Sequence, residues 1–241
     1  MIKGVMFDFS GTLFRAEPTE TWLRAVITEA GYDLREDELT ACAARLEEAG
    51  ALPGGPPPRH VPEYLAELWK ERDLSAERHR AAYTELAREA ALPCPDLADA
   101  LYDRTLTPAA WLPYPDTEST LRELRRREIP VAVVSNIGWD LRPVFRHHGV
   151  DDLIEQYLLS FEQGAKKPDP TIFQTACALL GVAPDEVVMV GDNHTADGGA
   201  ATLGCIVHLV EHLPVDQRPA ALTAVLDLLG PSTPEDALPQ I

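Results

Sequence analysis

The sequence is poor in lysine, has no long apolar segment and carries a large deficit of positive charge. Only 4 of its 21 basic residues are lysines, and the others are arginines. No apolar run approaches the roughly 20 residues that a membrane-spanning helix needs. Met1 leads directly into a predicted strand, without a signal peptide. We therefore expect a cytoplasmic protein without a membrane partner.

Acidic residues outnumber basic ones by 39 to 21, which gives a formal net charge of −18. Such a charge is repelled by phosphodiester backbones and anionic lipids, so we expect no nucleic acid partner. An anionic small molecule would need cations placed locally around it. Each lysine is therefore a candidate for that role: Lys3, Lys70, Lys166 and Lys167.

Cysteine is scarce as well. The 4 cysteines, at positions 42, 94, 177 and 205, lie far apart and form no C-x-x-C pair. This spacing is typical of reduced, mostly buried thiols and unlike that of a metal cluster. Nothing in the sequence indicates an oligomeric state.

The chain begins with a short apolar run, Gly4-Val5-Met6-Phe7, followed by Asp8 and a turn at Gly11. The run predicts a buried strand that ends at a carboxylate. Residues 14–110 then show helical apolar spacing without a strand pattern. Three consecutive prolines at 56–58 interrupt this part with a loop. The predicted helices cover 19–31, 36–50, 62–73, 75–91 and 96–104.

Residues 111–230 alternate helices with apolar strands, which predicts an α/β fold. Strands are expected at 129–136, 157–160, 187–192 and 205–209, and helices at 117–128, 141–149, 170–180 and 219–229. The alternation implies a Rossmann-like parallel sheet with helices on both faces. We expect a core domain (1–13 and 111–230), a helical cap domain (14–110) and a loose tail (231–241). Because the cap begins beside Asp8, it should cover the carboxyl ends of the strands as a lid.

Polar side chains stand where these strands end, or in the loops just beyond. They are Asp8, Ser135 with Asn136, Lys166 with Lys167, and Asp192 with Asp197. Each alone has a simpler explanation, as a helix cap, a turn residue or a solvated lysine. Ligands of open α/β sheets bind at the carboxyl ends of the strands, so together the residues indicate an active site.

Four segments resemble, in order, the motifs of the haloacid dehalogenase (HAD) superfamily. They are residues 8–12, 133–136, 167–173 and 191–197. The resemblance covers about residues 1–13 and 113–229, and an insert between the first two motifs fits the subgroup with a helical cap. It implies a hydrolase, most simply a magnesium-dependent phosphatase that acts on a small phosphorylated metabolite.

The resemblance also implies roles for individual residues. Asp8 would attack phosphorus and become an aspartyl-phosphate. Mg²⁺ would be held by Asp8, Asp192 and the backbone carbonyl of Ser10, with Asp197 in support. The ammonium group of Lys167 would hold the phosphoryl oxygens. The other expected phosphate or substrate contacts are Thr12, Ser135, Asn136 and, in the Pro-rich cap loop, Arg59 and His60.

One position departs from the family pattern. Phosphatases of the family usually carry Asp two residues after the nucleophile, where it protonates the leaving group, but this chain has Ser10. A serine hydroxyl is no acid near pH 7, and losing a general acid costs about 10²–10⁴-fold in rate. Two histidines could take the place of this acid: His194, within the fourth motif, and His60.

Other chemistries of the family also lack this Asp. Phosphonoacetaldehyde hydrolases cleave a C–P bond with a cap lysine, which here would be Lys70. Haloacid dehalogenases lack the metal-binding pattern that Asp192 and Asp197 preserve. Transport ATPases need membrane segments that this chain lacks. A module that binds a phosphorylated ligand without turnover stays open as a further possibility.

Overall fold

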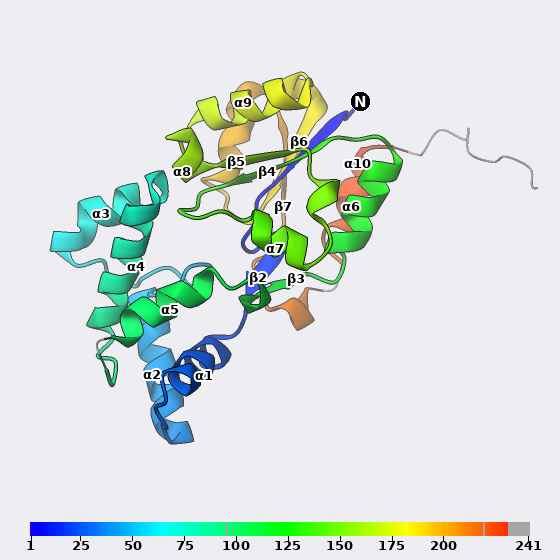
Figure 1. Ribbon diagram of the computed structural model, residues 1–241. Helices are drawn as coiled ribbons and strands as arrows, with labels where there is room; N and C mark the ends of the chain where they lie inside the picture. The colour runs from blue at the N-terminus through cyan, green and yellow to red at the C-terminus, as the bar shows by residue number, and fades with distance from the viewer. Residues whose placement is uncertain (95, 219, 231–241) are drawn as a thin grey trace, which may run out of the picture.

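The computed structural model describes residues 1–94, 96–218 and 220–230. Within these ranges, five parallel strands form one sheet in the order β5-β4-β1-β6-β7 (Figure 1). The strands are β1 (Gly4–Phe7), β4 (Val131–Ser135), β5 (Gln156–Leu159), β6 (Val187–Gly191) and β7 (Ile206–Leu209). The predicted α/β fold with a parallel sheet is thus confirmed, and the predicted tail at 231–241 lies outside the described residues.

The alternation of side chains along β1 separates two apolar layers. Val5 and Phe7 pack into one cluster of buried side chains, while Met6 packs into another. The first layer lies under α6 (Thr117–Arg126), α7 (Arg142–His147) and α10 (Thr223–Leu228). The second lies under α9 (Pro170–Leu180) and η6 (Asp197–Leu203), a 3₁₀ helix. Helices therefore cover both faces, and the carboxyl ends of the strands stay open at one edge.

A group of helices is inserted between β1 and β4 and lies at that edge (lower left in Figure 1). We call residues 17–110 the helical block. Its helices are α1 (Thr19–Glu29), α2 (Glu36–Ala49), α3 (Ala66–Glu71), α4 (Ala76–Glu89) and α5 (Leu97–Thr105), with 3₁₀ turns η1 (Glu63–Leu65), η2 (Arg72–Leu74) and η3 (Pro108–Ala110). The division into a core and a cap domain at residues 13/14 and 110/111 remains a prediction.

Local details differ from the expectation. Residues 14–110 contain a strand after all, because β2 (Phe14–Ala16) pairs antiparallel with β3 (Trp111–Pro113). The helix predicted at 62–73 is divided into η1, α3 and η2. The last helix, α10, is shorter than predicted. The remaining short elements are η4 (Asp151–Leu153), α8 (Ser160–Gln163), η5 (Pro184–Glu186) and η7 (Val215–Gln217).

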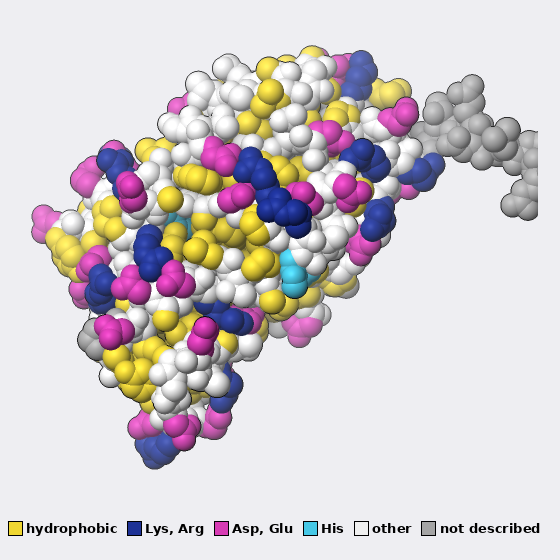
Figure 2. Space-filling model, in the orientation of Figure 1, with side chains coloured by type: hydrophobic (Ala, Val, Ile, Leu, Met, Phe, Trp, Pro, Cys, Tyr) yellow, Lys and Arg dark blue, Asp and Glu magenta, His cyan; other side chains and the backbone are white. Residues whose placement is uncertain are grey.

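The surface in Figure 2 shows acidic and basic side chains interspersed on one face. Many of them form ion pairs, such as Arg142 with Glu162 at 2.8 Å and Arg80 with Asp103 at 2.6 Å. All four cysteines are free, and Cys42, Cys177 and Cys205 are buried. In the described ranges, every helix is too short or too polar to cross a bilayer.

Aromatic side chains join the β2–β3 pair to the core. The ring of Phe14 lies 5.3 Å from that of Phe9 and 5.0 Å from that of Phe145, measured between centroids. Phe9 also packs on Trp111 at 4.8 Å. All four side chains are at most 1% exposed. Trp111 therefore belongs to the junction between the helical block and the sheet.

We expect Phe14→Ala to lower the free energy of unfolding by about 3–5 kcal/mol, because it removes a buried ring that neighbouring aromatics cannot replace. The control is Leu179→Ala, whose side chain is 52% exposed and should cost under about 1 kcal/mol. Urea unfolding of both variants measures the difference. Equal losses would mean that the aromatic junction does not stabilise the fold.

Candidate active site

Residues from separate strands meet in one cavity of about 180 Å³ at the carboxyl edge of the sheet. Asp8 follows β1, Ser135 ends β4 and Asp192 follows β6. Lys167 comes from the loop between α8 and α9, and Asp197 begins η6. The predicted convergence of these five residues is confirmed, since all of them line this cavity.

Lys167 lies at the centre of the polar cluster. Its ammonium group donates hydrogen bonds to Asp8 Oδ1 at 2.8 Å and to Asp197 Oδ1 at 2.6 Å. The residue is only 3% exposed. Burial by itself would lower the pKa of Lys167, but the charges of Asp197 and Asp8 outweigh it and raise the pKa above its usual range. The lysine is therefore a permanent cation.

Opposing effects act on the pKa of Asp8 as well. The pKa of its carboxyl is raised from 3.8 to about 7, mainly by burial and in addition by the charges of Asp197 and Asp192. The cation of Lys167 works in the opposite direction. An ionised Asp8 is thus costly without more positive charge nearby.

Three carboxylates form a candidate site for a cation that would supply this positive charge. Oxygen atoms of Asp8, Asp192 and Asp197 lie within 4.8 Å of one another. Carboxylate oxygens are the ligands that hard cations such as Mg²⁺ prefer. Asp197 is itself fixed, because its Oδ2 accepts a hydrogen bond from the backbone N–H of Asn193 at 2.9 Å. The donor set therefore fits Mg²⁺ in chemistry and in placement.

A chain of contacts that the sequence did not suggest connects Asp192 to the helical block. His212, just beyond β7, contacts Asp192 Oδ2 through Nδ1 and Arg15 through Nε2. Arg15 also donates to the backbone carbonyl of Gly54 at 2.7 Å. Because an arginine can only donate, Nε2 of His212 is the acceptor and Nδ1 carries the proton toward Asp192. The sequence feature that could have identified His212 is its position shortly after a predicted strand.

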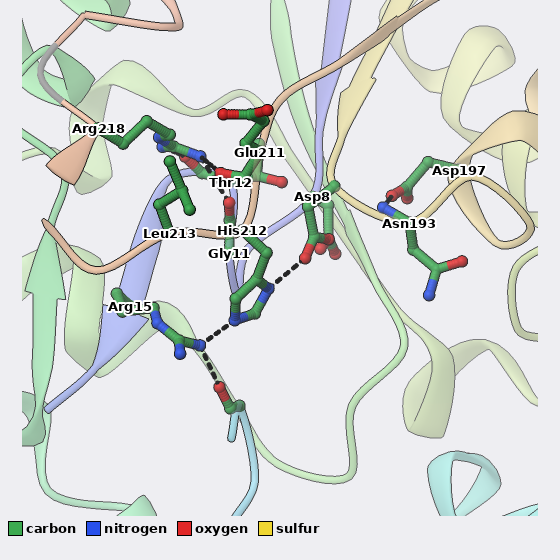
Figure 3. Close-up of polar contacts among 12 residues, drawn as sticks. Asp8, Gly11, Thr12, Arg15, Asn193, Asp197, Glu211, His212, Leu213 and Arg218 are labelled. Atoms are coloured by element: carbon green, nitrogen blue, oxygen red, sulfur yellow. Dashed lines mark hydrogen bonds and ion pairs between the residues drawn. The ribbon is translucent and has the colours of Figure 1, made fainter. Parts of the chain in front are cut away.

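The turn after Asp8 is held by Arg218, which was also missed. This side chain is 4% exposed and donates to the carbonyl oxygens of Gly11, at 2.6 Å, and of Thr12 (Figure 3). Its guanidinium carbon lies 3.2 Å from the ring centroid of Tyr114. The buried guanidinium of Arg218 therefore fixes the backbone of this turn.

The residues predicted to contact phosphate have different surroundings in the structure. Ser135 is 3% exposed and lines the cavity. Asn136 also lines it, but its amide exchanges hydrogen bonds with the backbone of Lys167, at 2.8 Å to the carbonyl and 2.7 Å from the N–H. Asn136 thus positions Lys167. Thr12 is fully buried outside the residues that line the cavity, and its hydroxyl has no hydrogen-bond partner among the described residues.

Arg59 and His60 do not reach this cavity, contrary to expectation. They line a second hollow with residues of α2 and α4. The backbone N–H of Arg59 is bonded to the carbonyl of Glu48 at 3.1 Å, and its guanidinium pairs with the same residue at 3.1 Å. The Pro-rich loop is therefore tied back onto α2, and only Pro53 and Gly54 from its start line the cavity.

His194 and Lys70, the side chains expected to supply substitute chemistry, do not line the described part of the cavity either. Lys70 is exposed and lies 3.9 Å from Glu67. Lys166 is half-buried and donates to the backbone carbonyl of Lys70. Of the two consecutive lysines, Lys167 is the one in the cavity.

The helical block contributes a different set of polar groups, from η2 and the start of α4. They are Arg72, Asp73, His79 and Tyr83. No pattern in the sequence indicates them, because charged residues on short amphipathic helices are usually solvated. Here they line the cavity together with the carboxylate cluster.

Ser10 also lines the cavity. Its hydroxyl is buried and has no hydrogen-bond partner among the described residues. The backbone of Gly54 approaches so closely that a Cβ at this position would lie 2.9 Å from Ser10 Oγ. Glycine at position 54 therefore permits the helical block to approach Ser10 this closely.

Known proteins share this sequence pattern. A family model described as a haloacid dehalogenase-like hydrolase matches residues 2–203. The (S)-2-haloacid dehalogenase 4A of Burkholderia cepacia is 33% identical over 196 residues, which are 76% of this chain and 80% of that protein. The glyceraldehyde 3-phosphate phosphatase of Methanopyrus kandleri is 34% identical over 207 residues, 82% and 78% of the two chains.

Solved structures share the fold. A dehalogenase crystal structure matches with a TM-score of 0.66 and 23% identity, over 95% of this chain and 98% of the other. The chain spans most of the length of both relatives, and its acidic cluster and lysine lie together as the motif order predicts. It therefore belongs to the haloacid dehalogenase-like hydrolases and is a hydrolase.

Proposed function

We propose that this hydrolase is a Mg²⁺-dependent phosphatase that acts on a small phosphorylated metabolite through an aspartyl-phosphate on Asp8. The observation that carries this proposal is the single buried ammonium group of Lys167 between Asp8 and Asp197, with Asp192 beside them. Such a cluster has no evident structural purpose, because burying like charges together costs stability.

The charge balance supports the proposal. Three ionised carboxylates carry −3, which Lys167 and a divalent cation bring formally to zero. A neutralised site can accept a phosphate dianion in spite of the net charge of −18 on the whole chain. The residues that would hold Mg²⁺ are Asp8, Asp192 and the backbone carbonyl of Ser10, with Asp197 in support.

The chain's own residues then have separate tasks. A carboxylate oxygen of Asp8 forms the bond to phosphorus while the bond from phosphorus to the leaving oxygen breaks. Lys167 and the hydroxyl of Ser135 bind the non-bridging phosphoryl oxygens. In-line phosphoryl transfer needs mainly positioning and charge stabilisation, which these groups provide. Bound Mg²⁺ would supply further positive charge to the same oxygens.

The relatives point to two classes of substrate. Glyceraldehyde 3-phosphate phosphatase and the phosphoserine phosphatase of Thermus thermophilus, 41% identical over 91 residues, are named for phosphorylated small molecules. The haloacid dehalogenase is named for a halogenated acid. Because haloacid dehalogenases lack the metal-binding pattern, the cluster of Asp8, Asp192 and Asp197 favours the phosphatase. The small cavity supports a small substrate.

C–P bond hydrolysis and binding without turnover have less support. C–P bond hydrolysis needs a lysine in the cavity wall that the helical block provides, and Lys70 lies outside it. A module that only binds a phosphorylated ligand would have no evident use for the ion pair between Asp8 and Lys167. We therefore keep phosphate ester hydrolysis as the proposed reaction.

We expect Mg²⁺-dependent release of phosphate from a panel of phosphate monoesters that includes 4-nitrophenyl phosphate. Lys167→Ala should lower kcat/KM by at least about 10³-fold, because it removes a charge that binds the transferring group. The matched control is Lys166→Ala, which removes the adjacent lysine outside the cavity and should stay within about threefold of the parent.

Asp8→Asn and EDTA should each abolish release in the same assay. Phosphate release that survives Asp8→Asn would refute the covalent mechanism. Chloride release from 2-chloropropionate, with no phosphate release from any ester, would instead establish a dehalogenase.

We also expect the free energy of unfolding of the metal-free protein to depend on whether Asp8 is ionised. Its pKa of about 7 in the folded state exceeds the value of 3.8 for an unburied group. The folded state therefore binds this proton more tightly, and the stability that the proton gives is lost as pH rises from about 4 through 7. Asp8→Asn removes this loss, so the variant should be the more stable protein at pH 8.

Urea unfolding in EDTA at pH 4.5 and pH 8 measures this effect. The advantage of Asp8→Asn should be large at pH 8 and small at pH 4.5, and Mg²⁺ should reduce it at pH 8. Asp152→Asn, at an exposed carboxylate, corrects for the change in net charge. An advantage that is equal at both pH values would show that burial of Asp8 is not the cause.

A further inference from the structure

The proposed reaction leaves one proton unassigned. The leaving oxygen of an ordinary phosphate ester needs a proton as its bond to phosphorus breaks. Ser10 cannot provide it near pH 7, and the carboxylates of Asp8, Asp192 and Asp197 are committed to the nucleophile and to the cation. Among the described residues that line the cavity, the one other carboxyl group belongs to Asp73.

Asp73 is tied to the loop that would bind the phosphoryl group. It lies in η2, and its backbone carbonyl accepts a hydrogen bond from Ser160 Oγ at 2.6 Å. The same hydroxyl accepts from the backbone N–H of Ile137 at 2.8 Å. Ile137 lines the cavity and stands two residues after Ser135. One hydroxyl group therefore connects the backbone of Asp73 to the end of β4.

A second contact holds this wall of the helical block in place. His79 packs against Gly138 so tightly that a Cβ on the glycine would lie 2.1 Å from Cβ of His79. Nε2 of the His79 ring lies 3.9 Å from Oδ1 of Asp73. Nδ1 of the same ring is hydrogen-bonded to the hydroxyl of Tyr102 at 2.8 Å. These contacts hold η2 and α4 against the strand ends, with Asp73 among the residues that line the cavity.

The surroundings of Asp73 suit an acid. The residue is 4% exposed, and burial raises the pKa of its carboxyl, against the opposing charges of Arg72, Lys166 and Lys167. Arg72 lies beside it, with Nη2 3.4 Å from Oδ2. Burial, with Arg72, lowers the pKa of His79 to about 3. The imidazole is therefore neutral and carries no acidic proton near pH 7, whereas burial favours the protonated form of Asp73.

We propose that Asp73 donates the proton to the leaving oxygen, in the place that Ser10 cannot fill. This assignment rests on the phosphatase proposed above. As Asp8 bonds to phosphorus, the electron pair of the breaking bond goes to the leaving oxygen, which takes the proton of Asp73. The products of this step are the free alcohol, the aspartyl-phosphate and an ionised Asp73.

The same group completes the cycle. Water attacks the phosphorus of the aspartyl-phosphate, and ionised Asp73 takes a proton from that water. The bond between phosphorus and Asp8 breaks, phosphate leaves, and Asp8 is again a carboxylate. Atoms and charges balance over the two steps, and Asp73 ends as it began, protonated.

Two aryl esters of similar size test the assignment. 4-Nitrophenolate is a stable anion near neutral pH and leaves without a proton. Phenol, like the side chain of tyrosine, keeps its proton up to about pH 10, so its departure needs a proton donor. For Asp73→Asn we expect kcat/KM on phenyl phosphate to fall by about 10²-fold or more, and on 4-nitrophenyl phosphate by under about fivefold. kcat/KM reports the steps up to the aspartyl-phosphate.

A burst of 4-nitrophenolate close to one equivalent should precede slow turnover in Asp73→Asn, because breakdown of the aspartyl-phosphate also lacks its base. Asp73→Ala adds an independent measurement, since added formate should restore the hydrolysis of phenyl phosphate there. Glu71→Gln is the control. This acid lies on the same segment, pairs with Arg78 at 2.5 Å on the surface and does not line the cavity.

The outcomes separate the two proposals. If Asp8→Asn still releases phosphate, the proposed function fails and the role of Asp73 fails with it. If Asp8→Asn is inactive but Asp73→Asn slows both esters equally, or neither, the phosphatase stands and Asp73 is not its acid. Loss on phenyl phosphate alone, without a formate effect, would make Asp73 a residue that positions the ester.

Discussion

The buried ammonium group of Lys167 holds together acidic side chains that would otherwise repel one another. It bonds to Asp8 and Asp197 at 2.8 and 2.6 Å, and it is almost completely removed from water. Such pairs are net stabilising only where the geometry is very good, because desolvation of each charge is expensive. Asn136 provides this geometry by bonding to both backbone groups of Lys167. The strand ends are therefore arranged around one cation.

The helical block closes this arrangement from the other side. Three contacts join it to the sheet beside the site: Arg15 to the carbonyl of Gly54, Ser160 to the carbonyl of Asp73, and His79 against Gly138. Two of them use a backbone carbonyl, so they depend on where the chain runs and not on a particular side chain in the block. Asp8, Lys167 and Asp197 are at most 8% exposed in this cavity, and their burial strengthens the charge interactions among them.

The sequence predicted the part of the site that depends on local order along the chain. Asp8, Ser135 and Asp192 follow apolar strands, and parallel strands bring their carboxyl ends to one edge. Arg59 and His60 were placed wrongly, because the path of a Pro-rich loop is decided by its bonds to α2 and not by its composition. Asp73 and His79 were missed, because burial of charged residues in the helical block is a property of packing between distant segments. β2 was too short to show a pattern.

Ser10 and Gly54 show how closely the helical block approaches the turn after Asp8. A Cβ at position 54 would lie 2.9 Å from Ser10 Oγ. Glycine at position 54 therefore permits this approach, while Ser10 offers no acidic group at the contact. In our proposal the proton donor is Asp73, in η2, whose backbone carbonyl is bonded to Ser160 at the other side of the junction. The proposed donor therefore depends on the contact between the helical block and the strand ends, whereas the nucleophile Asp8 directly follows β1 of the sheet itself.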